Sequence, residues 1–227
     1  MTQPEPAPAR SDEARQVRAW LLERDFGRIE GWARGASQAL RELSAFLYED
    51  DERLRWRAIA ALGRAAAVRA EANPEAVRNF LRRQFFSMNE ESGNVGWHAP
   101  EAIGEILAQV EALLPEYAAM LAATLHRPPF ERGTHWAVAR LAEKTPEVFA
   151  ESAPALKPSL NAADPYLRAY AGVTLLRIGD PEARSAIQAL ESDPAEIRVY
   201  NEQTGEMEAS TVGEMIRAAR KTRRDQS

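Results

Sequence analysis

Residues 164–183 read DPYLRAYAGVTLLRIGDPEA. A template of five positions begins at Leu167, with offsets of 0, 4, 7, 8 and 11, and these positions lie on one face of a helix. Its residues are Leu167, Ala171, Thr174, Leu175 and Ile178. The stretch opens on Asp164-Pro165, a capping side chain followed by a proline that suits the first helical turn. Small alanine and glycine residues inside the pattern allow neighbouring helices to approach closely. The stretch therefore predicts a helix that packs tightly against others.

The same spacing recurs along the chain. Copies begin at Leu54, Val95, Gly133 and Leu167, so the starts are 41, 38 and 34 residues apart. The third copy is weaker because a charged residue, Arg140, stands at one of its apolar positions. A period of this length, with two helices in each period, is typical of an α-solenoid.

Other pairs of a capping residue and a proline predict further helix starts, with a simple turn as the alternative at each. These pairs are Asn73-Pro74, Thr145-Pro146, Asp180-Pro181 and Asp193-Pro194. Alternation of β-branched residues is nearly absent before residue 196.

The C-terminal part departs from the repeat. Residues 197–200 predict a strand, 201–205 a turn and 207–212 a return strand. Thr211 and Glu214 form a capping box for a last helix that reaches about Arg220. We interpret this part as a cap over the exposed apolar end of the stack, which terminal repeats require.

The quoted stretch resembles the HEAT-like repeat of phycobilin lyases, although Leu176 stands where that repeat usually has glycine. Residues 54–63 form a second good copy. The segments 55–58 and 96–105 are similar to an uncharacterised family of small bacterial HEAT-repeat proteins, and this resemblance extends over roughly residues 12–220. It implies a HEAT-like fold and says little about function, because such repeats serve unrelated partners.

These patterns together predict an all-α fold, a HEAT-like superhelix (solenoid) with a small C-terminal β-hairpin and a capping helix. The expected parts are a disordered tail at 1–10, HEAT-like helical repeats at 11–193, and the hairpin with its capping helix at 194–227. The tail is rich in proline and alanine and does not resemble a secretory signal.

Composition limits the function. The net charge of −5 argues against a general nucleic-acid binder, which needs a cationic surface. The chain has no cysteine, which excludes disulfides, thiolate metal sites and cysteine nucleophiles and fits a cytoplasmic protein. No run of about 18 apolar residues is present, so we expect no membrane partner.

Offset 2 of the repeat points away from the predicted core and offset 3 lies on the flank, and both carry unusual side chains. Offset 2 gives Trp56, Trp97, His135 and Ala169, and offset 3 gives Arg57, His98, Trp136 and Tyr170. In a HEAT-like stack the second helix of each pair lines the concave face, so these residues predict a binding groove. The expected partner-binding residues are Trp56, Arg57, Trp97, His98, Glu101, His135, Trp136 and Arg140. The alternative is that the tryptophans seal the packing between repeats.

The segment 92–100 has two interpretations. Pro100 lies inside the helical pattern and would bend the helix toward a ligand. Alternatively, Gly96 belongs to a tight turn that lets helices come close. Glu101 and Glu105 share a helix face near His98, which leaves a weak metal or acid–base site open.

Two classes of HEAT-fold enzyme can be compared with this sequence by their characteristic residues. Iron enzymes similar to deoxyhypusine hydroxylase carry His-Glu dipeptides, and this chain has none. HEAT-like DNA glycosylases flip a base into an aromatic groove backed by a carboxylate, which Trp97, Glu101 and Trp136 would suit, but the acidic balance opposes it.

The sequence therefore predicts a non-catalytic interaction or scaffold module that binds a protein partner along its concave face, with no catalytic residue, metal or cofactor. The alternative is a HEAT-fold enzyme or ligand chaperone, bilin-lyase-like or DNA-glycosylase-like, that uses residues 97–105; a small-molecule ligand thus stays open.

Overall fold

The computed structural model describes residues 12–89 and 96–225. The tail expected at 1–10 and the start of the second repeat copy at Val95 lie outside these residues. The first two helices are α1 (Asp12–Glu23) and α2 (Phe26–Gly35). The inner row continues with α4 (Glu52–Ala72), α6 (Ala99–Gln109), α8 (Glu131–Leu141), α10 (Pro165–Ile178) and α12 (Val212–Asp225).

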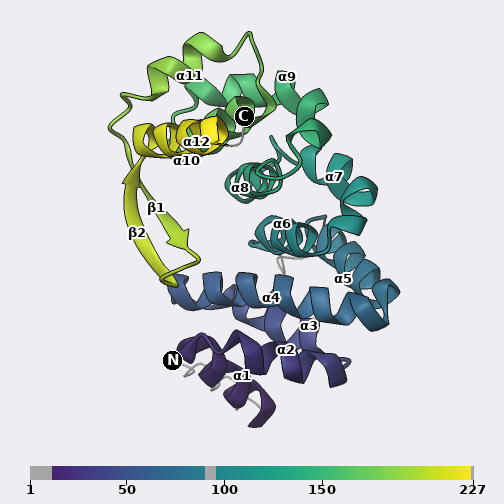
Figure 1. Cartoon of the computed structure of the whole chain (residues 1–227). Coiled ribbons are helices and arrows are strands. Elements are labelled where there is room, and N and C mark those ends of the chain that lie inside the picture. Colours follow the sequence, from purple (N-terminus) through teal and green to yellow (C-terminus); the bar gives the residue numbers. More distant parts are fainter. Residues whose placement is uncertain (1–11, 90–95, 226–227) are drawn as a thin grey trace, which may run out of the picture.

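The outer row consists of shorter elements. They are α3 (Ala39–Ser44) with η1 (Ala45–Tyr48), α5 (Pro74–Ser87), η2 (Glu111–Leu113) with α7 (Leu114–Ala122), η3 (Pro146–Ser152), α9 (Ala153–Leu156), η4 (Lys157–Asn161) and α11 (Arg184–Leu190). Each inner helix from α2 to α12 packs on the next one, and the outer elements cover the convex side, so the stack curves (Figure 1). The predicted all-α HEAT-like solenoid is confirmed.

Small residues set the spacing of the inner row. A Cβ atom on Gly104 of α6 would lie 2.5 Å from the Cβ of Ala137 and 2.8 Å from its Cα on α8. The two backbones therefore approach more closely than any larger pair of residues would permit. The buried apolar side chains of both rows form one continuous cluster along the stack.

Two of the predicted helix starts are confirmed. Asn73 accepts a hydrogen bond from the Ala76 N–H at the start of α5, and Asp164 does the same for Tyr166 at the start of α10. Thr145-Pro146 begins a 3-10 helix, η3, in place of an α-helix.

The other two predicted starts are wrong. The Asp180 side chain accepts from the Ala183 N–H, and α11 begins only at Arg184. Asp193 accepts from the Ala195 N–H in a turn that leads into a strand. In both cases the carboxylate caps a turn before the chain takes up its next element.

Pro100 does not bend a helix, because α6 begins at Ala99 and the proline therefore lies in its first turn. Gly96 supports the interpretation as a tight turn. Its N–H donates to the Ser87 carbonyl oxygen, and a Cβ at this position would overlap the Ser87 side chain.

The hairpin consists of β1 (Glu196–Asn201) and β2 (Glu206–Thr211), which pair antiparallel with Val199 opposite Glu208. The capping box is confirmed: Thr211 accepts from the Glu214 N–H, and the Glu214 carboxylate accepts from the Thr211 N–H. Behind the hairpin, α12 packs on α10 and buries Val212 and Ile216.

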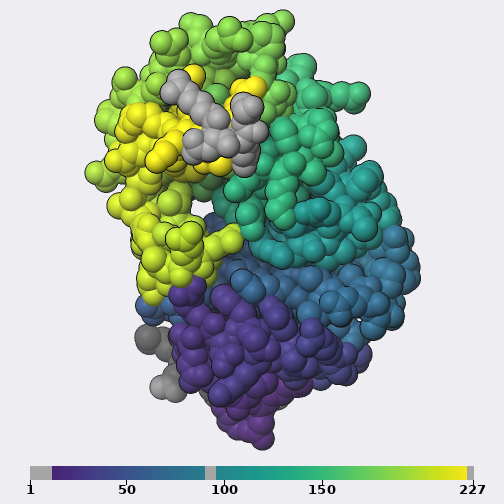
Figure 2. Space-filling model, in the orientation of Figure 1, coloured from purple at the N-terminus to yellow at the C-terminus, as the bar shows by residue number. Residues whose placement is uncertain are grey.

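The hairpin itself leaves the last repeat and crosses the concave side to reach α4 (Figure 1). In the space-filling view the hairpin lies against the N-terminal helices, and a gap remains between it and the middle of the stack (Figure 2). The solenoid is thus closed into a ring. Among the described residues, no helix is both long and apolar enough to span a lipid bilayer.

Candidate binding cleft

A cleft of about 350 Å³ lies on the concave side, among residues of α4, α6, α8 and α10 and the hairpin. Its aromatic lining comes from four repeats. The aromatic residues are Trp56, Trp97, Trp136, Tyr166 and Tyr170. Five aromatic side chains around one small space provide flat apolar walls, which is the common make-up of a ligand-binding pocket.

Two of these rings and a third from the hairpin, all far apart in the sequence, pack on one another. The centroids of Trp56 and Trp136 are 4.8 Å apart with their planes inclined at 61°. On its other side Trp56 stacks on Tyr200 of β1, with centroids 5.9 Å apart and planes almost parallel. This contact joins the helical wall of the cleft to the hairpin. The Trp97 side chain is different, because 55% of it is exposed to solvent.

Two carboxylates line the cleft, and Glu101 is the one on α6. Glu101 on α6 is only 7% exposed, and its Oε1 atom lies 3.2 Å from Nδ1 of His98. Its Oε2 atom is buried and accepts no hydrogen bond from the described residues. Gly133 on α8 makes room for this carboxylate, since a Cβ at that position would overlap both oxygens.

The arginines that line the cleft each have an acceptor of their own. Arg132 pairs with Asp164, and its guanidinium lies 4.6 Å from the centroid of the Tyr166 ring. Arg198 of the hairpin pairs with Glu52 of α4 at 3.1 Å.

Arg55, the third of these arginines, donates a hydrogen bond of 2.6 Å to the Glu49 carbonyl oxygen. None of the three reaches Glu101 by a hydrogen bond or ion pair within the described chain.

The side chain of Tyr170 lies in the buried part of the cleft wall. Burial raises the pKa of Tyr170 well above its usual range, and the neighbouring Tyr166 and the charge of Glu101 raise it further.

The structure brings five of the eight predicted partner-binding residues together in this cleft. These five are Trp56, Trp97, His98, Glu101 and Trp136.

His135, Arg57 and Arg140 lie elsewhere. His135 is fully buried between α8 and η4, where its Nε2 atom lies 2.8 Å from Oγ of Ser159 and its Nδ1 atom 2.7 Å from the Glu131 carbonyl oxygen. Burial lowers the pKa of His135 to about 4. This side chain is part of the packing between the rows.

The two arginines hold the hairpin. Arg57 is buried, and it donates to the Gly205 carbonyl oxygen and the Glu206 carboxylate. Arg140 forms ion pairs with Glu105 of α6 and Glu202 of the hairpin turn, both at 3.0 Å.

Three further residues of the cleft were not expected from the sequence: Arg132, Tyr166 and Arg198. Arg132 and Tyr166 share a register that could have identified them, because each immediately precedes the first position of its repeat copy. Arg198 carries no such signal, since the position of the hairpin depends on contacts with distant helices.

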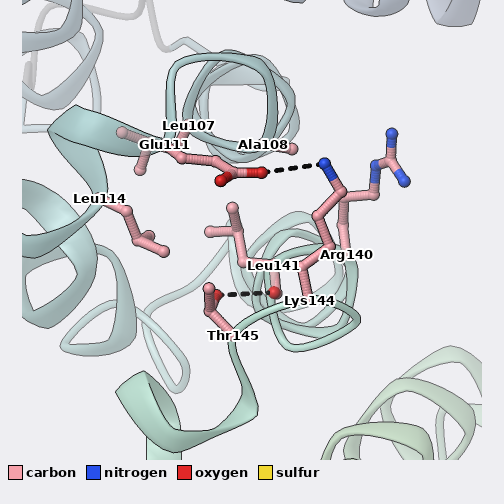
Figure 3. A pocket seen from close by; sticks show the side chains of 8 residues that line it. All are labelled: Leu107, Ala108, Glu111, Leu114, Arg140, Leu141, Lys144 and Thr145. Atoms are coloured by element: carbon pink, nitrogen blue, oxygen red, sulfur yellow. Dashed lines mark hydrogen bonds and ion pairs between the residues drawn. The ribbon is translucent and has the colours of Figure 1, made fainter. Parts of the chain in front are cut away.

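A second cavity, between α6, α7 and α8, is much smaller. It measures about 20 Å³, enough for about one water molecule. Figure 3 shows the ion pair of Lys144 with Glu111 across it, while the Arg140 guanidinium points away. This cavity is too small for a ligand. Within residues 12–89 and 96–225 there is also no group of three or more metal-binding side chains.

Comparison with known proteins adds little about function. No protein-family profile matches the chain, and no curated protein sequence matches it. Among the solved structures that resemble this chain are an engineered protein and an archaeal protein. An engineered protein has a TM-score of 0.47 and 14% identity over 95% of this chain and 98% of its own. An archaeal HEAT-like repeats protein from Thermococcus onnurineus NA1 has a TM-score of 0.43 and 18% identity over 94% of this chain and 81% of its own.

Proposed function

We propose that the protein is a non-catalytic binding module that holds a segment of a partner protein in the aromatic cleft on its concave side. The observation that carries the proposal is the exposure of Trp97 beside this cleft. A large aromatic side chain gains free energy when it leaves water, and tryptophan is among the residues that most often dominate a protein interface. An exposed tryptophan next to an enclosed aromatic space is the arrangement expected of an unoccupied interface.

The size of the cleft defines how a partner would bind. A volume of about 350 Å³ accepts one or two side chains and not a whole helix. The hairpin crosses the concave side and its contacts with Arg57 keep it there, while an opening of about 520 Å³ remains between its turn and the helices α8 and α10. A partner would therefore insert projecting side chains into the cleft and place its backbone against Trp97 at the rim.

Capture of partners from native extract tests the proposal. The wild-type protein and Trp97→Ala are compared, with Met120→Ala on the outer helix α7 as the control, since Met120 is exposed to a similar degree, 49%. We expect the wild type and the control to retain the same protein, and Trp97→Ala to lose it with a penalty of about 2 kcal/mol or more. Equal capture by all three would show that the cleft is not the binding surface.

A second candidate is a small-molecule function, as a ligand chaperone or a HEAT-fold enzyme. It is favoured by the contact between His98 and Glu101 in the cleft, because such a pair can move a proton. Protein purified from its native source is denatured, and mass spectrometry then detects any small molecule that it releases. This measurement distinguishes the two candidates. A small molecule that copurifies in stoichiometric amount supports the second, and its absence together with a captured protein supports the first.

A further inference from the structure

The cleft wall contains one carboxylate that the described residues satisfy only in part. Glu101 is buried, its Oε2 atom has no donor among the described residues, and only His98 approaches Oε1. A buried polar atom without a hydrogen bond costs free energy, so native proteins rarely leave one. The cations nearby do not remove this cost, because Arg132 and Arg198 already pair with other carboxylates. Because Oε2 lies against Gly133 of α8, an occupant that brings positive donors would remove this cost once the carboxylate turns toward the cleft.

We propose that the occupant of the cleft is the guanidinium group of an arginine side chain from the partner protein. The proposal rests on the proposed function and specifies the chemistry of the partner. The guanidinium would donate to the Glu101 carboxylate while its flat faces lie against the aromatic walls that Trp56 and Trp136 provide.

The rim of the same cleft already shows this mode of binding. Arg132 lies over the Tyr166 ring at 4.6 Å and pairs with Asp164 at the same time. The guanidinium of Arg132 is thus held between a ring and a carboxylate. The rings of Trp56 and Trp136 with the Glu101 carboxylate form a second set of this kind, and it holds no guanidinium of the described residues. The volume of about 350 Å³ is sufficient for an arginine side chain.

A guanidinium suits this space better than an ammonium group or an anion. It is planar and weakly hydrated, so it loses less on entering an enclosed aromatic site than the compact, strongly hydrated ammonium of lysine. An anion would meet the Glu101 carboxylate, whose Oε2 atom has no hydrogen bond among the described residues, and the two negative charges would repel each other. The contact of His98 with Oε1 is long, at 3.2 Å, and the incoming guanidinium replaces it.

Short capped peptides of the form glycine–X–glycine test the proposal, with arginine, lysine, citrulline or glutamate at X. Spermidine serves as a free cation. Binding is followed by tryptophan fluorescence and by NMR of the indole N–H groups, since three of the five tryptophans line the cleft. We expect the arginine peptide to bind in the millimolar range and the citrulline and glutamate peptides not to bind.

Matched variants assign the binding to Glu101. Glu101→Gln keeps the shape of the side chain and removes its charge, and we expect it to weaken the arginine peptide about tenfold or more. Glu52→Gln is the control, because it removes a carboxylate of the same cleft that already pairs with Arg198, and we expect less than about a twofold change. Circular dichroism melting confirms that both variants are folded.

Several results would overturn the proposal: equal binding of the lysine or citrulline peptide, tighter binding of spermidine, no change on Glu101→Gln, or no binding of any peptide. None of these would decide the proposed function, because capture of a partner by the wild type and its loss in Trp97→Ala do not depend on the charge of the occupant. Conversely, equal capture by Trp97→Ala would defeat the proposed function even where the arginine peptide binds.

Discussion

The guanidinium of Arg57 on α4 donates a hydrogen bond of 3.1 Å to the carbonyl oxygen of Gly205, 148 positions later in the hairpin turn. The same buried group donates to the Leu22 carbonyl oxygen at 2.7 Å and to the Glu206 carboxylate at 2.8 Å. Arg24 adds hydrogen bonds to three carbonyl oxygens of the turn, those of residues 202–204. The C-terminal hairpin is therefore anchored on the first helices of the stack.

Arg57→Ala is expected to lower the free energy of unfolding by about 2–4 kcal/mol, because several charge-assisted hydrogen bonds are lost and buried carbonyl groups lose their donor. Urea unfolding measures this change. Arg53→Ala is the control, since Arg53 meets the same Glu206 only at 3.4 Å on the exposed side of the helix. We expect it to cost less than about 1 kcal/mol. Similar effects of the two substitutions would mean that Arg57 does not anchor the hairpin.

Two single substitutions of a helical glycine by alanine are expected to change the stability of the protein in opposite directions. Gly104→Ala places a methyl group 2.5 Å from the Cβ of Ala137, so α6 and α8 must separate, at about 1–3 kcal/mol. Gly31→Ala meets no atom within 4 Å on α2 and is expected to stabilise the protein by up to about 1 kcal/mol through helix propensity. Thermal melting of the two variants measures both changes. A Gly104→Ala protein as stable as the wild type would contradict the close approach of α6 to α8.

The stability of the protein is expected to depend on pH through His135. Burial lowers the pKa of His135 from the ordinary value of 6.5 to about 4 in the folded protein. Between these values the unfolded chain binds a proton that the folded protein does not, so the free energy of unfolding falls as the pH drops from 6.5 toward 4. The full contribution, about 3 kcal/mol, is present above pH 6.5.

His135→Gln supplies the comparison, because glutamine does not titrate. The difference in unfolding free energy between wild type and variant, measured by urea titration at pH 7 and at pH 4, is expected to shrink at the lower pH. A difference that does not change with pH would show that His135 titrates normally.

Two tryptophans of the cleft are expected to differ in their effect on stability. Trp97→Ala should cost less than about 1 kcal/mol, because more than half of this side chain is already exposed. Trp136→Ala should cost about 3 kcal/mol, because this ring packs on the core and on Trp56. Thermal melting separates them, and a large loss in Trp97→Ala would assign that residue to packing instead of binding.

Most of the fold could be predicted from the sequence, because its information is local. The spacing of apolar residues from Leu54 and Leu167 identified the inner helices α4 and α10, and the Thr211–Glu214 capping box identified the start of α12. The bounds of the hairpin followed from its turn residues. Pro100 left two interpretations open, because a proline in the first turn and a proline inside a helix look alike when the start of the helix is uncertain.

The cleft was only partly predictable, for a physical reason. The helical period gives the direction of a side chain from its own axis, and this was sufficient for Trp56 and Trp136. Trp97 lies in the turn before α6, so the repeat placed it in the cleft although it is not on the predicted helix. It does not reveal what another segment places over that side chain. His135 points to the same side in its repeat, but the 3-10 segment that carries Ser159 covers it. Arg57 was assigned to the groove because the local sequence gives no sign of its hydrogen-bond partner, Gly205, which lies 148 positions away.

The closed ring has a consequence for how the molecule opens. In a linear array each terminal unit frays on its own, since it has a neighbour on one side only. Here the turn of the hairpin rests on Arg24 and Arg57, so detachment of either end releases the other. We therefore expect amide hydrogen exchange in α1 and in the hairpin to occur in one shared opening event. These contacts join the two ends of the chain, so their formation carries a large loop-closure entropy and completes folding late.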